Sequence, residues 1–266
     1  MNKFYKENGY KVFNANIAEE VKKIRREFFN IFSTVSRLKK YSKKKLQTDK
    51  DIINFYKKDK KNWILAYDLL RNSHSIYALL ANKNFIKKIK KISGIRNPVL
   101  TSRMMVRVDM PDGEGSRPAG SHQDFCAHQG SNNSVTIWIP LQNVKLKNGA
   151  LKVIPKTHLQ GFVRDDENWS KKIVPKNLIS EKLASKFGKF VNAPMKLGEA
   201  ILFSTFSIHK SGINISDKIR FSLNIRFNDI ASKDYADRNF YLNEKIQLKT
   251  YDVNYEPAVN FDKNNI

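Results

Sequence analysis

The sequence predicts a mainly β protein with helices packed on its outside, and three observations lead to that fold class. The first is a set of apolar residues at helical spacing in the first third of the chain. The second is a change to alternating polar and apolar residues from about residue 99 onward. The third is that Gly, Pro, Asn and Asp separate these alternating segments, as turns do in β sandwiches and barrels.

Residues 16–92 are predicted to be mainly helical, because their apolar residues recur every three or four positions. The residues that form these stripes are Ile17, Val21, Ile24, Phe28, Phe29, Phe32, Trp63, Tyr67, Leu70, Ile76, Leu79 and Leu80. We expect the stripes to face the core. The dipeptide Asn97-Pro98 then interrupts the helical pattern.

Strands are predicted where the period changes to two. The segments are RMMVRVDM at 103–110, SVTIWIPL at 134–141, ALKVIP at 150–155, EAILFS at 199–204 and RFSLNIRF at 220–227. In the last segment the polar residues Arg220, Ser222, Asn224 and Arg226 alternate with apolar ones, so this strand has one polar and one apolar face. No internal repeat and no low-complexity linker divides the chain, and we expect a single domain.

The charge of the chain is strongly positive and uneven. The formal net charge is +24, and residues 1–100 hold 25 basic against 8 acidic residues, a difference of 17. A basic surface can contact nucleic acid, anionic membranes or polyanionic substrates. Most of these residues are lysines beside abundant Asn and Ile, without a nucleic-acid-binding motif, which favours ordinary solvated helix faces. A basic nucleic-acid-binding protein or nucleic-acid-directed oxygenase is the alternative.

Two further features of the composition narrow the possibilities. The single cysteine, Cys126, excludes an intrachain disulfide and any multi-cysteine metal site, so a metal would need nitrogen and oxygen ligands. There is no apolar run long enough to span a bilayer, and the polar start MNKFYKENGYKVF is unlike a signal peptide. The expected location is therefore the cytoplasm.

The segment GSHQDFCAHQG at 120–130 suggests a metal site. On a strand His122 and Asp124 point to the same face, while Gln123 points away. The third ligand is either His128 or His209. With His128 the site is local and suits zinc in a non-catalytic β-barrel. With His209 the set is two histidines and one carboxylate, which suits non-haem iron(II) and oxygen chemistry.

Arg220 favours His209, because a buried arginine eleven residues after that histidine can hold a dicarboxylate cosubstrate. These residues, together with "TIWIPL", "NGALKVIPKTH" and "GEAILFSTFSIHKSG", resemble the phytanoyl-CoA dioxygenase family over about residues 99–229. The family consists of Fe(II)- and 2-oxoglutarate-dependent oxygenases with a double-stranded β-helix, the cupin-like jelly roll. The resemblance implies a helical support over 1–98, a jelly-roll core over 99–229 and a C-terminal lid or tail over 230–266.

The resemblance also implies roles for individual residues. His122, Asp124 and His209 would hold the iron, and Arg220 would bind the distal carboxylate of 2-oxoglutarate. Three residues match family positions near the cosubstrate, each with a purely structural alternative, and they are Ser211, Trp138 and Arg107. The segment after the metal strand is expected to form a loop around a small-molecule substrate, with Phe125, His128, Gln129 and Asn132 as candidate contacts.

The implied reaction couples conversion of 2-oxoglutarate and O2 into succinate and CO2 to oxidation of a substrate C–H bond. Because Asp124 is present, where related halogenases have a small residue, hydroxylation or another oxidative outcome is expected. Amino-acid derivatives, sugar nucleotides or glycan precursors, acyl compounds and phosphonates are candidate substrates, and the basic surface slightly favours an anionic one. In the tail, Tyr235, Arg238, Phe240 and Tyr241 are candidates for a lid.

Overall fold

The computed structural model of the chain describes residues 1–101, 104–111, 120–128, 130–165 and 178–240. Its strands form two antiparallel sheets. One has the order β1-β7-β4-β9-β2, with β3 also paired to β9, and the other has the order β6-β5-β8. The strands are β1 (Tyr10–Asn14), β2 (Pro98–Leu100), β3 (Met105–Asp109), β4 (Val135–Pro140), β5 (Leu151–Val153), β6 (Val191–Ala193), β7 (Glu199–Ser204), β8 (His209–Lys210) and β9 (Arg220–Asp229).

All five predicted strand segments are strands in the structure, and the longest of them, β9, is central to the large sheet. One edge of β9 pairs with β4. The other edge pairs with β3 over its first half and with β2 over its second half. The strand β9 is therefore paired with other strands along both edges, over most of its length.

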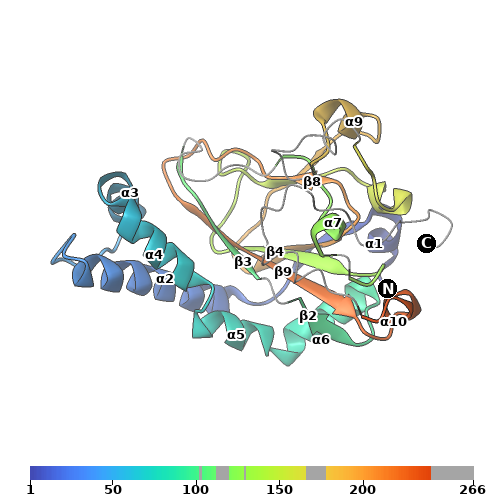
Figure 1. The fold of residues 1–266 in the computed structure, drawn as a ribbon, viewed down its shortest axis with the longest axis horizontal. Helices are drawn as coiled ribbons and strands as arrows, with labels where there is room; N and C mark the ends of the chain where they lie inside the picture. Colours follow the sequence, from blue (N-terminus) through green and yellow to red (C-terminus); the bar gives the residue numbers. More distant parts are fainter. Residues whose placement is uncertain (102–103, 112–119, 129, 166–177, 241–266) are drawn as a thin grey trace.

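The outer face of the large sheet is covered by the N-terminal helices (Figure 1). They are α2 (Ala18–Leu38), α3 (Asp49–Lys58), α4 (Lys60–Leu70), α5 (His74–Leu80) and α6 (Lys83–Ser93), whereas α1 (Lys3–Asn8) lies beside the edge strand β1. Residue patterns fix several helix ends. Thr48 and Asp51 form a capping box at α3, and α6 begins at the N-cap Asn82 and ends at Gly94, whose φ is 81°.

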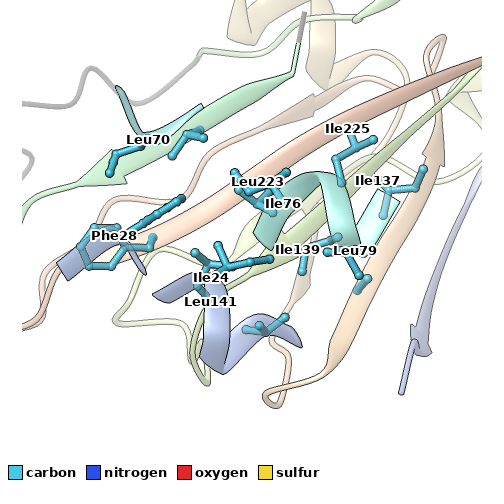
Figure 2. Close-up of a cluster of buried hydrophobic side chains, with 14 of the residues drawn as sticks. Ile24, Phe28, Leu70, Ile76, Leu79, Ile137, Ile139, Leu141, Leu223 and Ile225 are labelled. Atoms are coloured by element: carbon cyan, nitrogen blue, oxygen red, sulfur yellow. The ribbon is translucent and has the colours of Figure 1, made fainter. Parts of the chain in front are cut away.

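A continuous apolar core joins these helices to the sheet (Figure 2). Alternate residues of β4 and β9 meet the helical stripes, and the buried set includes Ile24, Phe28, Leu70, Ile76, Leu79, Ile137, Ile139, Leu141, Leu223 and Ile225. Burying one such side chain fully contributes about 1.5–3 kcal/mol. The predicted stripes are thus core, and they stabilise the side of the sheet away from the cavity described below.

The inner face of the large sheet packs against the small sheet. Trp138, Ile201 and Phe203 of the large sheet form one apolar cluster with residues of the small sheet, among them Leu151 and Val153. The polar face of β9 is also turned inward, because Arg220, Ser222 and Arg226 are all buried on it while the apolar face packs on the helices. Polar side chains therefore lie inside the sandwich, where they need partners.

The structure corrects the N-terminal part of the prediction in one respect. Within the region expected to be helical support, β1 (Tyr10–Asn14) is a strand that pairs with the edge of the large sheet along β7. A segment of five residues is too short for the alternation of polar and apolar residues to distinguish a strand from the helices that follow it. The pairing is decided by the free edge of β7, which is distant in the sequence.

A second correction concerns the segment after the metal motif, which was expected to be a loop. Phe125–His128 form the short helix α7. The remaining short helices are η2 (Thr157–Gln160), α9 (Glu181–Ser185) and α10 (Lys233–Asp237). Among the residues that the structure describes, no helix has both the length and the apolar composition needed to cross a membrane.

The C-terminal tail packs beside α7 as far as it is described. Tyr235 is buried, and its ring meets that of Phe240 edge to face. Arg238 donates hydrogen bonds to the Asp234 carboxylate and to the carbonyl of Gly130. Tyr241, the last residue expected in a lid, lies outside the described residues.

Candidate metal and cosubstrate site

Two chain segments that are distant in sequence meet at the candidate metal site. The backbone N–H of His122 donates to the carbonyl of His209 at 3.0 Å, and the N–H of His209 donates to the carbonyl of His122 at 3.0 Å. Such a reciprocal pair holds two residues directly opposite each other in an antiparallel arrangement. The imidazole rings consequently lie side by side, with their centroids 4.2 Å apart.

Asp124 completes a group of three. Nε2 of His122 lies 3.6 Å from Oδ1 of Asp124, and Nε2 of His209 lies 4.0 Å from the same oxygen. Within the described parts of the chain, these three side chains are the group of His, Cys, Asp and Glu whose ligand atoms all come within 4.8 Å of one another. The intervening Gln123 points away, and its amide bonds the backbone at Gly161, Phe206 and Val163.

Each histidine is oriented by its other ring nitrogen. Nδ1 of His122 lies 2.7 Å from the carbonyl oxygen of Gly120, and Nδ1 of His209 lies 3.0 Å from that of Ser207. A carbonyl oxygen can only accept, so Nδ1 carries the proton in both rings. The lone pair of each imidazole is then on Nε2, the atom that faces Asp124.

The protonation states suit metal binding. Burial, followed by the proximity of His122, lowers the pKa of His209 to about 3, so this imidazole is neutral at physiological pH. Burial would raise the pKa of Asp124, but the positive charge of Arg226 opposes this most strongly, and the pKa lies well below its ordinary value. A neutral imidazole and an ionised carboxylate are the forms that bind a metal.

Two side chains from the large sheet hold the Asp124 carboxylate. The hydroxyl of Thr136 donates to Oδ2 at 2.6 Å. Nε of Arg226 donates to Oδ2 and Nη2 donates to Oδ1, both at 3.0 Å. The set of two nitrogens and one oxygen, with the ligands on one side, fits Fe(II) better than the sulfur-rich or four-ligand sites of structural zinc.

A cavity of about 180 Å³ opens at these three side chains. Its lining comprises Met105, Arg107, His122, Asp124, Ala127, His128, Trp138, Leu151, Phe203, His209, Ser211, Asn224 and Arg226. Both sheets contribute to it. A larger surface groove between α2 and the segment at 45–49 includes one carboxylate, Asp49, which forms an ion pair with Arg25, and it shares no lining residue with the cavity at the histidines.

Arg220, the expected cosubstrate anchor, is buried and already paired, and it is not among the residues that line this cavity. Its Nε and Nη2 donate to Oδ2 of Asp109, at 3.1 and 2.6 Å, and Nη1 donates to the carbonyls of Gly149 and Gly212. Asp109 is the cross-strand neighbour of Arg220 on β3. Five N–H groups are available on a guanidinium, so one N–H of Nη2 remains for a cosubstrate carboxylate.

The other three candidates for cosubstrate contact line the cavity, and two of them also have structural roles. Arg107 lines the cavity and also forms an ion pair with Asp109 at 3.0 Å. It therefore has the structural role that was the alternative to a cosubstrate contact. Trp138 belongs to the core between the sheets, and its ring lies 5.7 Å from the guanidinium carbon of Arg220. Ser211 is half-buried in the lining.

Of the expected substrate contacts, the structure brings only His128 to the cavity. Phe125 is buried against Phe206, with ring centroids 4.1 Å apart, because α7 turns it away from the cavity. The backbone N–H of Asn132 bonds the Asp234 carboxylate of the tail, and Asn132 is not in the lining. These two expectations are not supported, and Gln129 lies outside the described residues.

Arg226, Thr136 and Asp109 are the residues that sequence reasoning missed. Arg226 was visible as a member of the polar face of the strand at 220–227, three same-face positions after Arg220. An arginine at each end of a strand's polar face indicates that the face is buried and that polar partners contact it. No sequence pattern marks Thr136 or Asp109 as a site residue, because the role of each depends on its cross-strand partner on β9.

Comparison with known proteins gives a consistent result. The family model described as Phytanoyl-CoA dioxygenase (PhyH) matches residues 5–222. A methylphosphonate hydroxylase of Gimesia maris is 27% identical over 146 residues, which cover 53% of this chain and 52% of that protein. A phytanoyl-CoA dioxygenase domain-containing protein 1 of Danio rerio is 30% identical over 141 residues, 52% of this chain and 46% of that protein. The chain thus spans about half the length of these curated relatives.

Solved structures show the same fold at low sequence identity. The non-heme alpha ketoglutarate dependent epimerase SnoN from nogalamycin biosynthesis has a TM-score of 0.56 and 16% identity, covering 85% of this chain and 80% of its own. EvdO2 from Micromonospora carbonacea var. aurantiaca, complexed with 2-oxoglutarate, has a TM-score of 0.54 and 13% identity, covering 85% and 88%. Together with the two antiparallel sheets, this likeness confirms the expected double-stranded β-helix.

Proposed function

Because the chain belongs to the phytanoyl-CoA dioxygenase family, we propose that it is an Fe(II)- and 2-oxoglutarate-dependent oxygenase that oxidises a C–H bond of a small metabolite. The observation that carries this proposal is the convergence of His122, Asp124 and His209 at one cavity. Their donor atoms and protonation states are those that Fe(II) requires.

In this proposal the three ligands would hold iron on one side only. Bound there with 2-oxoglutarate and O2, the metal supplies the oxidising power that converts a C–H bond while 2-oxoglutarate is converted into succinate and CO2. The protein orients its ligands through the Gly120 and Ser207 carbonyls. It also keeps His209 neutral by burial.

The cosubstrate site is proposed at the end of the cavity near Arg220. Support comes from the remaining N–H of Arg220, from Ser211 and from Arg107, which together offer positive charge and donors to a dicarboxylate. Trp138 would form the apolar wall beside the cosubstrate. Arg107 and Arg220 both pair with one carboxylate, Asp109.

For the substrate we propose a small, anionic metabolite. Two arginines, Arg107 and Arg226, line the cavity, and they pair with Asp109 and Asp124 respectively. A relative is named for hydroxylation of methylphosphonate, a small anion, and this makes phosphonates the first class to test. Carboxylates such as amino-acid derivatives and acyl compounds are the next class, and phosphate-bearing sugar nucleotides follow.

The test is anaerobic reconstitution with Fe(II), followed by exposure to O2 with 2-oxoglutarate and candidate substrates. Substrate-stimulated formation of succinate is the measurement. We expect His209→Ala to lower it by a factor of about 100 or more, because one of three metal ligands is lost. The matched variant His128→Ala should retain Fe(II) binding. If His128→Ala abolishes metal binding and His209→Ala does not, the zinc alternative replaces this proposal.

A further inference from the structure

The hydrogen bonds on Asp124 leave it only one position for a metal. An ionised carboxylate has about four lone-pair sites, two on each oxygen. Oδ2 accepts from both Thr136 and Arg226, so both of its sites are filled. Oδ1 accepts once, from Nη2 of Arg226, and its remaining site is on the oxygen that lies near the two histidines.

The two donors are held rigidly relative to each other. Thr136 on β4 and Arg226 on β9 are direct cross-strand partners in the centre of the large sheet. Both side chains are buried on its inner face, Thr136 at 0% and Arg226 at 4% exposure. A cross-strand pair between two central strands does not shift without breaking the sheet hydrogen bonds on both sides.

Arg226 is directed at Asp124 at a cost to its own hydrogen bonding. Its Nη1 is buried and has no hydrogen-bond partner among the described residues. A buried donor without an acceptor is unfavourable, and it is tolerated here while Nε and Nη2 both remain on the carboxylate. The position of Arg226 therefore satisfies the hydrogen bonds of the Asp124 carboxylate rather than all those of its own guanidinium.

We propose that Arg226 and Thr136 are positioning residues that keep Asp124 a one-oxygen metal ligand. The inference rests on the proposed Fe(II) site. A six-coordinate metal with three protein donor atoms keeps three positions open, two for the keto-acid end of 2-oxoglutarate and one for O2. If Oδ2 were released and also bound the metal, one of these positions would be lost.

The experiment compares Thr136→Val, which removes the hydroxyl at nearly constant volume, with Thr136→Ser, which restores it. Arg226→Lys is the companion variant, since lysine keeps the charge but lacks the two-nitrogen fork. Thr205→Val is the matched control, because Thr205 is also a buried threonine, bonded to Ser134 rather than to Asp124. Thermal unfolding first establishes that each variant is folded.

Two measurements without turnover are made on the full chain. Mn(II) affinity and water-proton relaxation give the metal affinity and the number of exchangeable waters on the metal. Anaerobic titration of the Fe(II)-loaded protein gives the affinity for 2-oxoglutarate. For Thr136→Val and Arg226→Lys we expect unchanged or tighter metal binding, one water fewer and 2-oxoglutarate affinity lower by about tenfold. Thr136→Ser and Thr205→Val should match the wild type.

The result separates this inference from the proposed function. Equal losses of metal and 2-oxoglutarate affinity in Thr136→Val and Arg226→Lys would mean a merely structural role and overturn it. So would wild-type values for the number of waters and for both affinities in these two variants. Failure of the wild-type protein to bind Fe(II) and 2-oxoglutarate at all would instead remove the proposed function on which the inference rests.

Discussion

At the scale of single residues, the Asp109 carboxylate decides how the cosubstrate end of the cavity is charged. It is 3% exposed and forms ion pairs with both Arg220 and Arg107. Burial raises the pKa of Asp109, but the two arginines outweigh burial, and the pKa lies below its ordinary value. The buried Arg220 and the partly buried Arg107 therefore share the negative charge of this carboxylate.

We expect Asp109→Asn to lower the free energy of unfolding by about 2–4 kcal/mol, because the buried guanidinium of Arg220 loses the carboxylate that it pairs with. Urea unfolding at neutral pH measures this change. The control is Asp237→Asn on α10, whose exposed pair with Lys233 should contribute little. An Asp109→Asn variant as stable as the wild type would show that the arginines find other partners.

The same residue predicts a pH dependence. A carboxyl whose folded pKa is lowered stabilises the protein fully above its unfolded pKa, near 4, and this contribution is lost as the pH falls toward the folded value. The difference in unfolding free energy between wild type and Asp109→Asn should therefore shrink as the pH is lowered below about 4. A difference that stays constant down to the acid unfolding transition would contradict the shifted pKa.

At the scale of elements, close contact between two glycine-containing turns holds Arg220 in place. Gly149 has a φ of 76°, and a Cβ added there would lie 2.6 Å from both the Gly212 carbonyl oxygen and Nη1 of Arg220. Gly212 in turn leaves no room for a Cβ, which would lie 2.5 Å from the carbonyl oxygen of Ala150. The glycines in "NGALKVIP" and "HKSG" thus allow two segments to supply carbonyls to one guanidinium.

Gly149→Ala should consequently destabilise the protein by about 2–4 kcal/mol, through the positive φ and the backbone clash. Because the clash also involves Arg220, we expect weaker 2-oxoglutarate binding as well. Thermal unfolding and anaerobic 2-oxoglutarate titration measure the two effects. Gly94→Ala is the control, since Gly94 at the end of α6 also has a positive φ, 81°, but an added Cβ there would meet only the Met1 side chain. If Gly149→Ala bound 2-oxoglutarate as tightly as the wild type, Arg220 would not be a contact of the cosubstrate.

At the scale of the whole molecule, stability and chemistry are assigned to opposite faces of one sheet. The outer face packs on the helices through apolar side chains, and the inner face carries the arginines and the metal-site partners. The candidate ligands join the segment at 121–124 to β8, and these segments are otherwise linked by the single backbone pair of His122 and His209. A metal would therefore connect two parts that the backbone connects weakly.

Metal binding should raise the melting temperature of the protein. A ligand at 100 times its Kd that binds only the folded state stabilises it by about 2.7 kcal/mol, which corresponds to a shift of about 5 °C for a chain of this size. Thermal unfolding with Mn(II) and with excess chelator measures the shift. His209→Ala should abolish it and His128→Ala should retain it. A shift that survives in His209→Ala would locate the metal elsewhere.

Much of the fold was accessible from the sequence because periodicity is a local property. The helical stripe that begins at Ile17 reports the core-facing side of a helix, and the alternation at 220–227 reports a strand with one apolar and one polar face; the structure confirms both. The strand β1 and the helix α7 were missed, because each is short and is settled by neighbours that are remote along the chain.

By itself the sequence determined five of the strands and predicted that His122, Asp124 and His209, rather than His128, form the metal site. What only the tertiary structure decided is which residues surround those ligands. Thr136 and Arg226 meet Asp124, and Asp109 meets Arg220, because strand register places them opposite one another. Register depends on pairing between distant segments, and for this reason no local pattern in the sequence records it.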